Sequence, residues 1–167
     1  KYTIEEYLNI YERLKKINSE IEFSSDFIIS YPGETNEDFN DTLNLVKRIK
    51  FINSYSFIFS PRPGTKAAGL ELIDKEISKE RLNKIQKHLF NHQIEKNKSF
   101  KEKLVEVLVE NRIKDQPKLF GRNKFNNSVI FAGDEKNVGK IVKVQIESTN
   151  QNNLFGKIKN NKNIRAA

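Results

Sequence analysis

The chain has 167 residues and a formal net charge of +8, with 30 Lys and Arg against 22 Asp and Glu. That length suits one or two small domains. No apolar run reaches the roughly 20 residues of a membrane-spanning helix, and no basic segment followed by an apolar stretch opens the chain. We therefore expect a cytoplasmic protein that does not enter the membrane.

Two residue types are missing from the composition. With no Cys, the chain forms no disulfide and supplies no thiolate to a zinc ion or an iron–sulfur cluster. It starts at Lys1 and contains no Met, so we expect a fragment from the C-terminal end of a longer protein. A radical or redox reaction would need the rest of that protein.

Basic side chains concentrate in the second half of the chain. Residues 1–74 have a net charge of −3, residues 75–103 of +5 and residues 104–167 of +6. Such a basic region is typical of a surface that binds a nucleic acid. A lysine-rich surface that meets only water is the alternative, and charge alone does not decide between them.

The first predicted elements are a helix and a strand. Thr3-Ile-Glu-Glu6 has the form of a capping box, and apolar residues then recur at helical spacing to about residue 17. Phe27–Ile29 is a short apolar run between polar residues, which predicts a strand buried on both faces.

A second helix and a second strand are expected over 36–50 and 55–59. Thr35 or Asn36 caps the helix, and its buried stripe is Phe39, Leu43, Val46 and Ile49. Strand, helix and strand in this order predict two parallel strands joined by a crossover. Because two such strands leave edges and faces uncovered, we expect them to end a larger parallel barrel or doubly wound sheet.

A third helix is expected from a Ser78 cap to about Phe100. From Leu104 onward, apolar residues alternate with polar ones, as in half-buried strands. About five short runs separated by glycine turns predict a small antiparallel β-barrel of the oligonucleotide-binding (OB) type. No internal repeat is evident, and residues 159–167 are expected to be a frayed tail.

Two loops follow the predicted parallel strands, at the edge where such sheets bind ligands. In Tyr31-Pro-Gly-Glu-Thr35, Glu34 or Thr35 is a candidate for a polar contact to a cofactor. A proline–glycine turn with a capping Thr is the alternative. In Ser60-Pro-Arg-Pro-Gly-Thr65, Arg62 would either clamp a carboxylate or phosphate or pair with Glu34.

Cations and aromatic residues cluster in the predicted small barrel. Cations that follow a phosphate backbone, with aromatic faces on which bases stack, are typical of single-stranded RNA binding. Phe120 is expected in the core because it precedes the Gly121 turn, whereas Phe125 is expected to be exposed. The candidate RNA-binding residues are Lys114, Lys118, Arg122, Lys124, Phe125, Asn126, Lys140 and Lys143. His88 and His92 lack the acidic residue of the metalloprotease motif, so no metal site is expected.

Several segments together resemble the tRNA methylthiotransferase family. They are Ser25–Thr35, Ser56–Thr65 with Ala67-Ala68, Val107–Glu110 and Leu119–Arg122. The resemblance implies an α/β plus all-β protein. Residues 1–100 would be the C-terminal part of a radical S-adenosylmethionine (SAM) core, a partial (β/α) TIM-type barrel. Residues 101–163 would be the RNA-binding TRAM domain, an OB-like antiparallel barrel, and 164–167 a tail.

The resemblance also implies an activity that the fragment alone does not have. The family adds a methylthio group to C2 of an N6-prenylated adenosine next to the anticodon, using SAM and two [4Fe–4S] clusters. The cluster cysteines are absent here, so no catalytic residue is expected in the chain. By the resemblance, Glu34, Thr35, Phe59 and Arg62 are part of the wall of the SAM site.

The implied partners are the anticodon stem-loop of tRNA and the missing N-terminal part of the same polypeptide, in a monomer. Specificity would come from a base extruded toward the mouth of the larger barrel. Ser30, Asn123 and Asn127 depart from the Gly, Thr and Arg that the family commonly has. The loss of an Arg at 127 would remove one cation from the RNA face.

Two other functions stay open. A sister enzyme methylthiolates an aspartate of a small-subunit ribosomal protein, and its loop usually departs from the Pro-Arg-Pro-Gly-Thr run present here. A non-catalytic RNA-binding protein would lack Cys without any missing domain.

Overall fold

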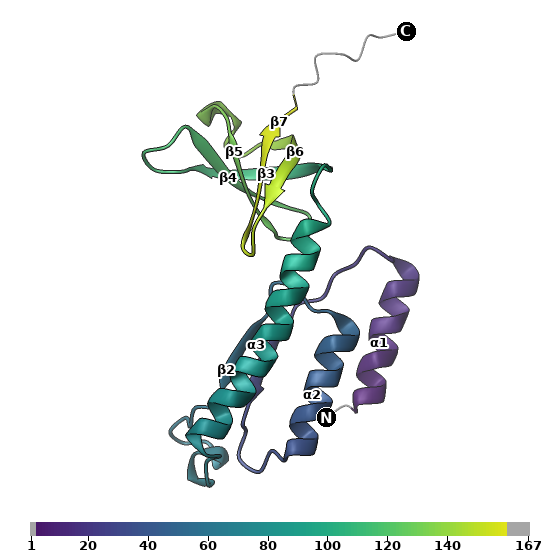
Figure 1. Cartoon of the computed structure of the whole chain (residues 1–167), viewed down its shortest axis with the longest axis vertical. Coiled ribbons are helices and arrows are strands. Elements are labelled where there is room, and N and C mark those ends of the chain that lie inside the picture. Colours follow the sequence, from purple (N-terminus) through teal and green to yellow (C-terminus); the bar gives the residue numbers. More distant parts are fainter. Residues whose placement is uncertain (1–2, 160–167) are drawn as a thin grey trace.

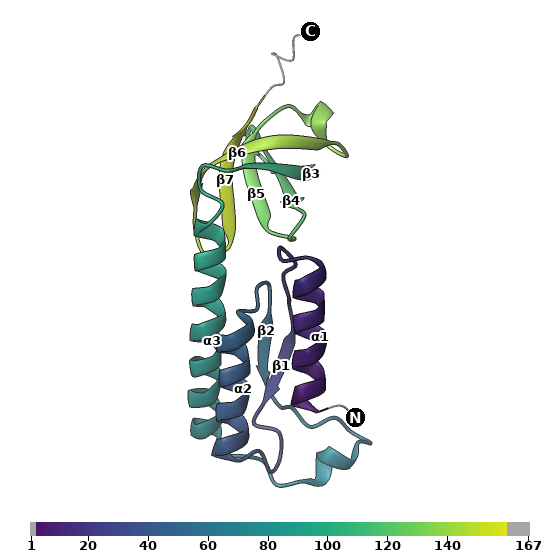
Figure 2. The same cartoon turned by 90° about the vertical axis from the view of Figure 1, so that its right-hand side faces the viewer.

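The computed structural model describes residues 3–159. An α/β unit lies at one end and a closed β-barrel at the other, and helix α3 runs from the first to the second (Figure 1; Figure 2). No helix in this described part is both long and apolar enough to cross a membrane. The elements are α1 (Ile4–Ile17), β1 (Asp26–Ile29), α2 (Asn36–Ile49), β2 (Tyr55–Ile58), α3 (Lys75–Lys98), β3 (Leu104–Arg112), β4 (Lys118–Asn123), β5 (Ser128–Ala132), β6 (Ile141–Thr149) and β7 (Asn153–Ile158), with short 3-10 helices at Lys66–Gly69 and Glu135–Asn137.

The starts of the first two helices are set by the local sequence, as predicted. At α1, Thr3 and Glu6 form the expected capping box, in which Thr3 N donates to Glu6 Oε2 over 2.8 Å. At α2, Thr35 is the N-cap and its hydroxyl accepts from Asp38 N. The predicted stripe of α2 is confirmed, because all four of its apolar residues are buried.

The predicted Ser78 cap of α3 is wrong. Asp74 is the N-cap, and its Oδ1 accepts from Glu76 N over 2.8 Å and from Ile77 N over 3.1 Å. These bonds lower the pKa of Asp74, and the carboxylate also meets the positive end of the helix dipole. Ser78 instead lies buried in the first turn, so α3 begins earlier than expected.

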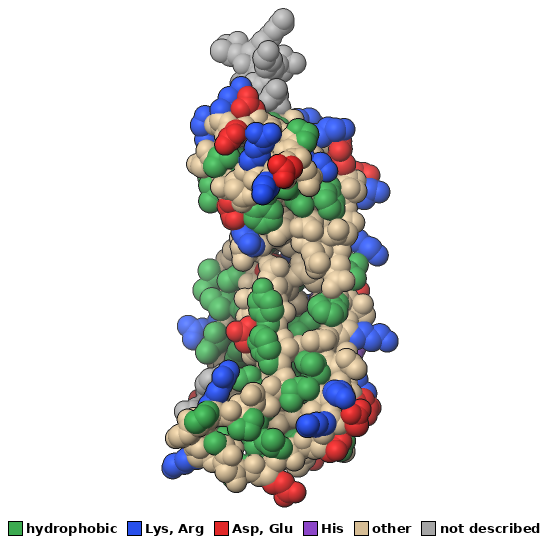
Figure 3. Space-filling view, turned by 90° about the vertical axis from the view of Figure 1, so that its left-hand side faces the viewer, with side chains coloured by type: hydrophobic (Ala, Val, Ile, Leu, Met, Phe, Trp, Pro, Cys, Tyr) green, Lys and Arg blue, Asp and Glu red, His purple; other side chains and the backbone are tan. Residues whose placement is uncertain are grey.

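Strands β1 and β2 pair in parallel, as predicted. Phe27 and Ile29 are buried in one cluster with the stripe of α2 and with apolar residues of α3. The predicted burial of β1 on both faces is wrong for the described residues, because Ile28 and Phe57 are 62% and 52% exposed on the other face. Figure 3 shows hydrophobic side chains gathered on this part of the surface.

Strands β3 to β7 close into a barrel in the order β3-β4-β5-β7-β6. The predicted alternation is confirmed, since Val107, Val109, Val144 and Ile146 are at most 1% exposed in its core. The prediction of a wholly antiparallel barrel is wrong, because β5 and β7 pair in parallel. Residues 160–167, which include most of the predicted tail, lie outside the described residues.

The barrel contains a repeat that the sequence analysis missed. Val105-Glu-Val-Leu-Val-Glu110 corresponds to Val142-Lys-Val-Gln-Ile-Glu147, and Leu119-Phe-Gly-Arg122 corresponds to Leu154-Phe-Gly-Lys157. The pairing of β3 with β6 agrees, because Val105 lies opposite Val144 and Val107 opposite Val142. Hairpins β3–β4 and β6–β7 are thus two copies of one unit, and β5 lies between their second strands.

A glycine in each copy allows an unusually close approach of two strands. A Cβ atom at Gly121 would lie 2.3 Å from Leu108 O, and one at Gly156 would lie 2.2 Å from Gln145 O. Each glycine is paired next to a register shift in its antiparallel partner strand. The two glycines therefore permit the strong coiling that closes a barrel of so few strands.

We expect Gly156→Ala to destabilise the barrel by about 3 kcal/mol, because the methyl group would overlap a backbone oxygen that is held in place by the sheet. Thermal and urea unfolding measure the loss. Gly69→Ala is the matched control, since a Cβ there would meet nothing within 4 Å. Equal stability of the two variants would contradict the close approach at Gly156.

Candidate nucleic-acid interface

A buried ion pair that the sequence analysis missed lies at the carboxyl end of β1. Arg81 Nη1 of α3 is 2.7 Å from Glu34 Oε1, and the two side chains are only 8% and 12% exposed. Arg81 also donates to Glu34 O and Asn36 Oδ1, while Ser30 N donates to Glu34 Oε2. Of the two alternatives for Arg62, pairing with Glu34 is wrong, because Arg81 is the ion-pair partner of that carboxylate.

Two buried polar atoms beside this ion pair have no hydrogen-bond partner among the described residues. They are Ser30 Oγ and Arg81 Nε. Ser30 is 3% exposed and has a φ of 56°, the left-handed region in which glycine is favoured. Unpaired buried polar atoms are costly, so the hydrogen bonding of this corner of the α/β unit is incomplete within the described residues.

The other predicted cofactor residues surround the same corner. Thr35 is engaged in the helix cap, where its hydroxyl donates to Asp38 Oδ2 over 2.7 Å. Phe59 is half-buried and packs against Tyr31, with ring centroids 4.9 Å apart. Arg62 is exposed in the loop that follows β2. Contact of these residues with a cofactor stays a prediction.

The barrel lies at the opposite end of the β1–β2 sheet from this corner (Figure 2). On α3, Arg81 contacts this corner of the α/β unit. Asn97, farther along the same helix, contacts the barrel. Their sixteen-residue separation corresponds to about 24 Å along a helix axis. The helix thus separates this corner of the α/β unit from the barrel by about that distance.

The predicted RNA-binding residues do not share one surface. Lys124, Phe125 and Asn126 lie in the turn between β4 and β5, which faces the α/β unit. Arg122 lies on the outer face of β4, as its partial exposure within the alternating burial of that strand indicates. Lys118, the first residue of β4, lies on the same outer face as Arg122. Three exposed lysines lie elsewhere on the barrel, in the β3–β4 turn and at the start of β6: Lys114, Lys140 and Lys143.

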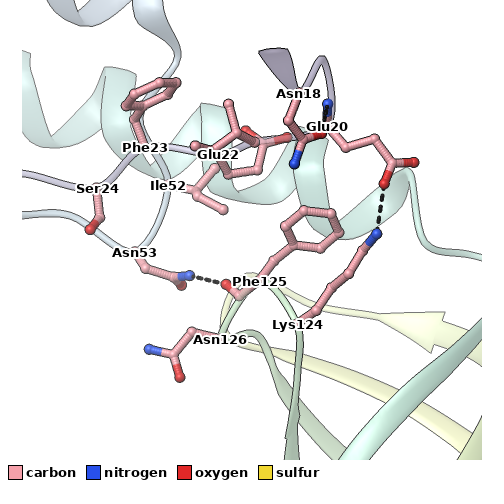
Figure 4. A pocket seen from close by; sticks show the side chains of 11 residues that line it. Asn18, Glu20, Glu22, Phe23, Ser24, Ile52, Asn53, Lys124, Phe125 and Asn126 are labelled. Carbon is pink, nitrogen blue, oxygen red and sulfur yellow. Dashed lines mark hydrogen bonds and ion pairs between the residues drawn. The ribbon is translucent and has the colours of Figure 1, made fainter. Parts of the chain in front are cut away.

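The turn between β4 and β5 packs against the α/β unit around an open pocket of about 380 Å³ (Figure 4). Lys124 Nζ lies 2.6 Å from Glu20 Oε2 and holds the pKa of Glu20 below its usual value. Asn53 Nδ2 donates to Phe125 O over 2.9 Å. Lys124 and Lys96 lie 4.9 and 4.6 Å from the centroid of the Phe125 ring.

The expected positions of the two phenylalanines are therefore wrong. Phe125 is only partly exposed and packs against the barrel core and against Phe100, with ring centroids 5.7 Å apart. Phe120 lies outside the core, because β4 alternates and Leu119 is its inward residue. The guanidinium carbon of Arg122 lies 5.4 Å from the centroid of the Phe120 ring.

Buried amides join the barrel to α3. Asn97, 1% exposed, donates from Nδ2 to Asn150 O and Gln151 O in the β6–β7 turn, each over 2.9 Å. Its Oδ1 accepts from Gln93 Nε2 over 3.0 Å and from Asn127 Nδ2 over 2.9 Å. The side chain thus uses both hydrogens and both lone pairs, and it contacts two separate turns of the barrel.

The barrel and the end of α3 match a known domain family. Residues 98–159 match the TRAM domain family. The predicted TRAM domain is thereby confirmed.

The chain is similar to several curated tRNA-2-methylthio-N(6)-dimethylallyladenosine synthases. It is 61% identical over 158 residues to that of Pelagibacter ubique (strain HTCC1062), covering 95% of this chain and 35% of the relative. It is 42% identical over 159 residues to that of Wolbachia pipientis subsp. Culex pipiens (strain wPip), and the match covers 93% of this chain and 36% of the relative. It is 42% identical over 160 residues to that of Clostridium novyi (strain NT), and the match covers 95% of this chain and 35% of the relative.

The predicted resemblance to the methylthiotransferases is confirmed by these relatives. The chain spans about a third of their length. Membership of the α/β unit in a larger radical SAM barrel stays a prediction, because within the described residues this unit has only a two-stranded sheet.

The Asn at 127 has a structural role in this TRAM domain. Its side chain is 3% exposed and donates to Asn97, so this position does not face solvent or RNA. Asn123 is buried as well, and its Oδ1 accepts from Phe125 N and Asn127 N over 3.0 Å each. The departure at 127 therefore belongs to the junction with α3, and the departure at 123 to the hydrogen bonds within the β4–β5 turn.

We expect Arg81→Met to destabilise the α/β unit by about 3–5 kcal/mol, because it leaves the buried Glu34 carboxylate without a counter-charge. Lys84→Met is the control, since it breaks an exposed i,i+4 pair with Glu80 and should change stability by about 0.5 kcal/mol or less. Chemical denaturation measures both. If the two variants lost similar amounts of unfolding free energy, the buried Arg81–Glu34 pair would not be more important to stability than the exposed pair.

We expect Asn97→Ala to lower stability by about 2–3 kcal/mol, since four hydrogen bonds are lost and buried carbonyl and amide groups stay unpaired. Hydrogen exchange should also rise in the β6–β7 turn, which Asn97 holds. Asn91→Ala, at an exposed position of α3, is the control. Unchanged exchange in that turn would show that Asn97 does not dock the TRAM domain.

Proposed function

We propose that this chain is the C-terminal part of a tRNA methylthiotransferase that adds a methylthio group to C2 of an N6-prenylated adenosine next to the anticodon. The observation that carries the proposal is 61% identity, over 95% of the chain, to a tRNA-2-methylthio-N(6)-dimethylallyladenosine synthase. The remaining two thirds of such a protein would supply the reaction centre. We place the whole enzyme in the cytoplasm as a monomer.

In this proposal the TRAM domain holds the anticodon stem-loop of tRNA. The net charge of +6 over residues 104–167 supports binding to a polyanion. Lys114, Lys118, Lys140 and Lys143 extend into solvent from the barrel and would contact phosphates. Such contacts position an RNA without reading its sequence.

The open face of the β1–β2 sheet supports a covering segment from the preceding part of the same polypeptide. Ile28, Tyr55 and Phe57 are 62%, 66% and 52% exposed on the strands, whereas parallel sheets are normally covered on both faces. Further parallel strands and helices, as in a radical SAM barrel, would bury these side chains.

SAM would lie at the carboxyl ends of the strands, where it would supply the methyl group and the radical. The unpaired Ser30 Oγ and Arg81 Nε fit the polar groups of such a ligand, and Phe59 and Arg62 lie in the adjoining loop. Glu34 and Thr35, both engaged within the protein, would hold this loop in place. The two [4Fe–4S] clusters would be ligated by cysteines outside this chain, which has none.

We expect the 167-residue chain to bind an anticodon stem-loop RNA with an affinity that falls steeply with salt. Lys118→Gln should weaken binding and reduce the slope of log K against log salt by about 1, because one phosphate contact is lost. Lys84→Gln removes the same charge from α3 and should leave both the affinity and its salt dependence unchanged. Fluorescence anisotropy across a salt series measures them, and a salt-independent affinity would contradict the proposal.

A further inference from the structure

Three apolar side chains form a row across the outer surface of the TRAM domain. Phe120 on β4 lies opposite Ile130 on β5, and Ile130 lies opposite Phe155 on β7. Neighbouring strands are about 4.8 Å apart, so the two phenylalanines stand about 10 Å from each other. All three residues are partly exposed, and none belongs to the barrel core or packs against it.

Basic and polar residues border this row along the strands. Arg122, Ser128 and Asn153 stand opposite one another on one side, and Lys118, Ala132 and Lys157 do so on the other. We name Phe120, Ile130 and Phe155 the stacking row. Of the four residues that flank its two ends, three are basic, Lys118, Arg122 and Lys157, and the fourth is Asn153.

The internal repeat makes the two ends of the stacking row equivalent. Phe120 and Arg122 in the first copy correspond to Phe155 and Lys157 in the second. The acids correspond as well, since Glu110 lies 3.1 Å from Arg122 and Glu147 lies 2.8 Å from Lys157. These ion pairs are exposed, so they hold the cations only weakly and leave them available to a phosphate.

We propose that the stacking row binds two unpaired RNA bases, one on each phenylalanine ring, while Lys118, Arg122 and Lys157 contact the adjoining phosphates. The inference rests on the proposed function and narrows it to single-stranded RNA. A base stacks on a protein ring only when it can leave its own neighbours, as an unpaired base can and a base inside a duplex cannot. Arg122 already lies 5.4 Å from the centroid of the Phe120 ring, so a base on Phe120 would use the remaining face of that ring. Three bordering cations favour RNA over an apolar protein segment as the occupant.

The test uses the whole chain with a single-stranded oligouridine of about twelve nucleotides that carries one central 2-aminopurine, and with an RNA duplex of equal length. Phe120→Leu and Phe155→Leu should each weaken binding of the single strand about tenfold and reduce the quenching of 2-aminopurine. Binding of the duplex should stay within about twofold. Phe120→Tyr keeps the ring face and should bind as the unaltered chain does.

Two controls separate stacking from general effects. Phe90→Leu removes an exposed ring from α3, 45% exposed, and should not change binding. Thermal unfolding of each variant should match that of the unaltered chain, since Phe120 and Phe155 lie outside the core.

Three results would overturn the inference. In the first, both Phe→Leu variants bind the single strand with an affinity within twofold of the unaltered chain. Stacking is then refuted, whereas phosphate contacts and the proposed function remain supported. In the second, the unaltered chain binds the duplex and the single strand with equal affinity, which refutes the preference for unpaired bases but not the proposed function. Failure of the unaltered chain to bind any RNA would refute the proposed function together with the inference.

Discussion

The buried Asn97 amide fixes the position of the TRAM domain on α3, and the relation between the two ends of the molecule follows from it. Burying an amide costs free energy unless its donors and acceptors are paired. Asn97 meets this need by contacting both the β6–β7 turn and Asn127, so the barrel has one favoured orientation. Gln93 extends the network to Asn53 in the loop before β2, and the Lys124–Glu20 pair adds a contact from the loop that follows α1.

Helix α3 connects two sites with different chemistry. Near its start, Arg81 organises the loop at the carboxyl end of β1 through the buried Glu34 carboxylate, and near its end Asn97 docks the barrel. The proposed cofactor site and the proposed RNA surface are thus held apart at a distance that a rigid helix sets. An RNA that reached both proposed sites would have to run along the molecule.

The repeat within the barrel accounts for features that otherwise look unrelated. Two hairpins of the same pattern bring Gly121 and Gly156 to equivalent close approaches. They also place one phenylalanine and one basic residue of each copy on the outer surface. Because β5 lies between them, it pairs antiparallel with β4 and parallel with β7. The strand order, the parallel pair and the stacking row therefore have one origin.

The amino-acid sequence by itself determined what depends on near neighbours: the capping box of α1, the N-cap of α2, the buried stripe of α2, and the alternation in β3 and β6. Periodicity and caps are local properties. It did not determine the partner of Glu34, the burial of Phe125 or the role of Asn127. Those depend on residues of α3 and distant turns that meet only in the folded chain. Only the tertiary structure decided them, because a charge or an amide in the interior pairs with whatever group packing brings within hydrogen-bond distance.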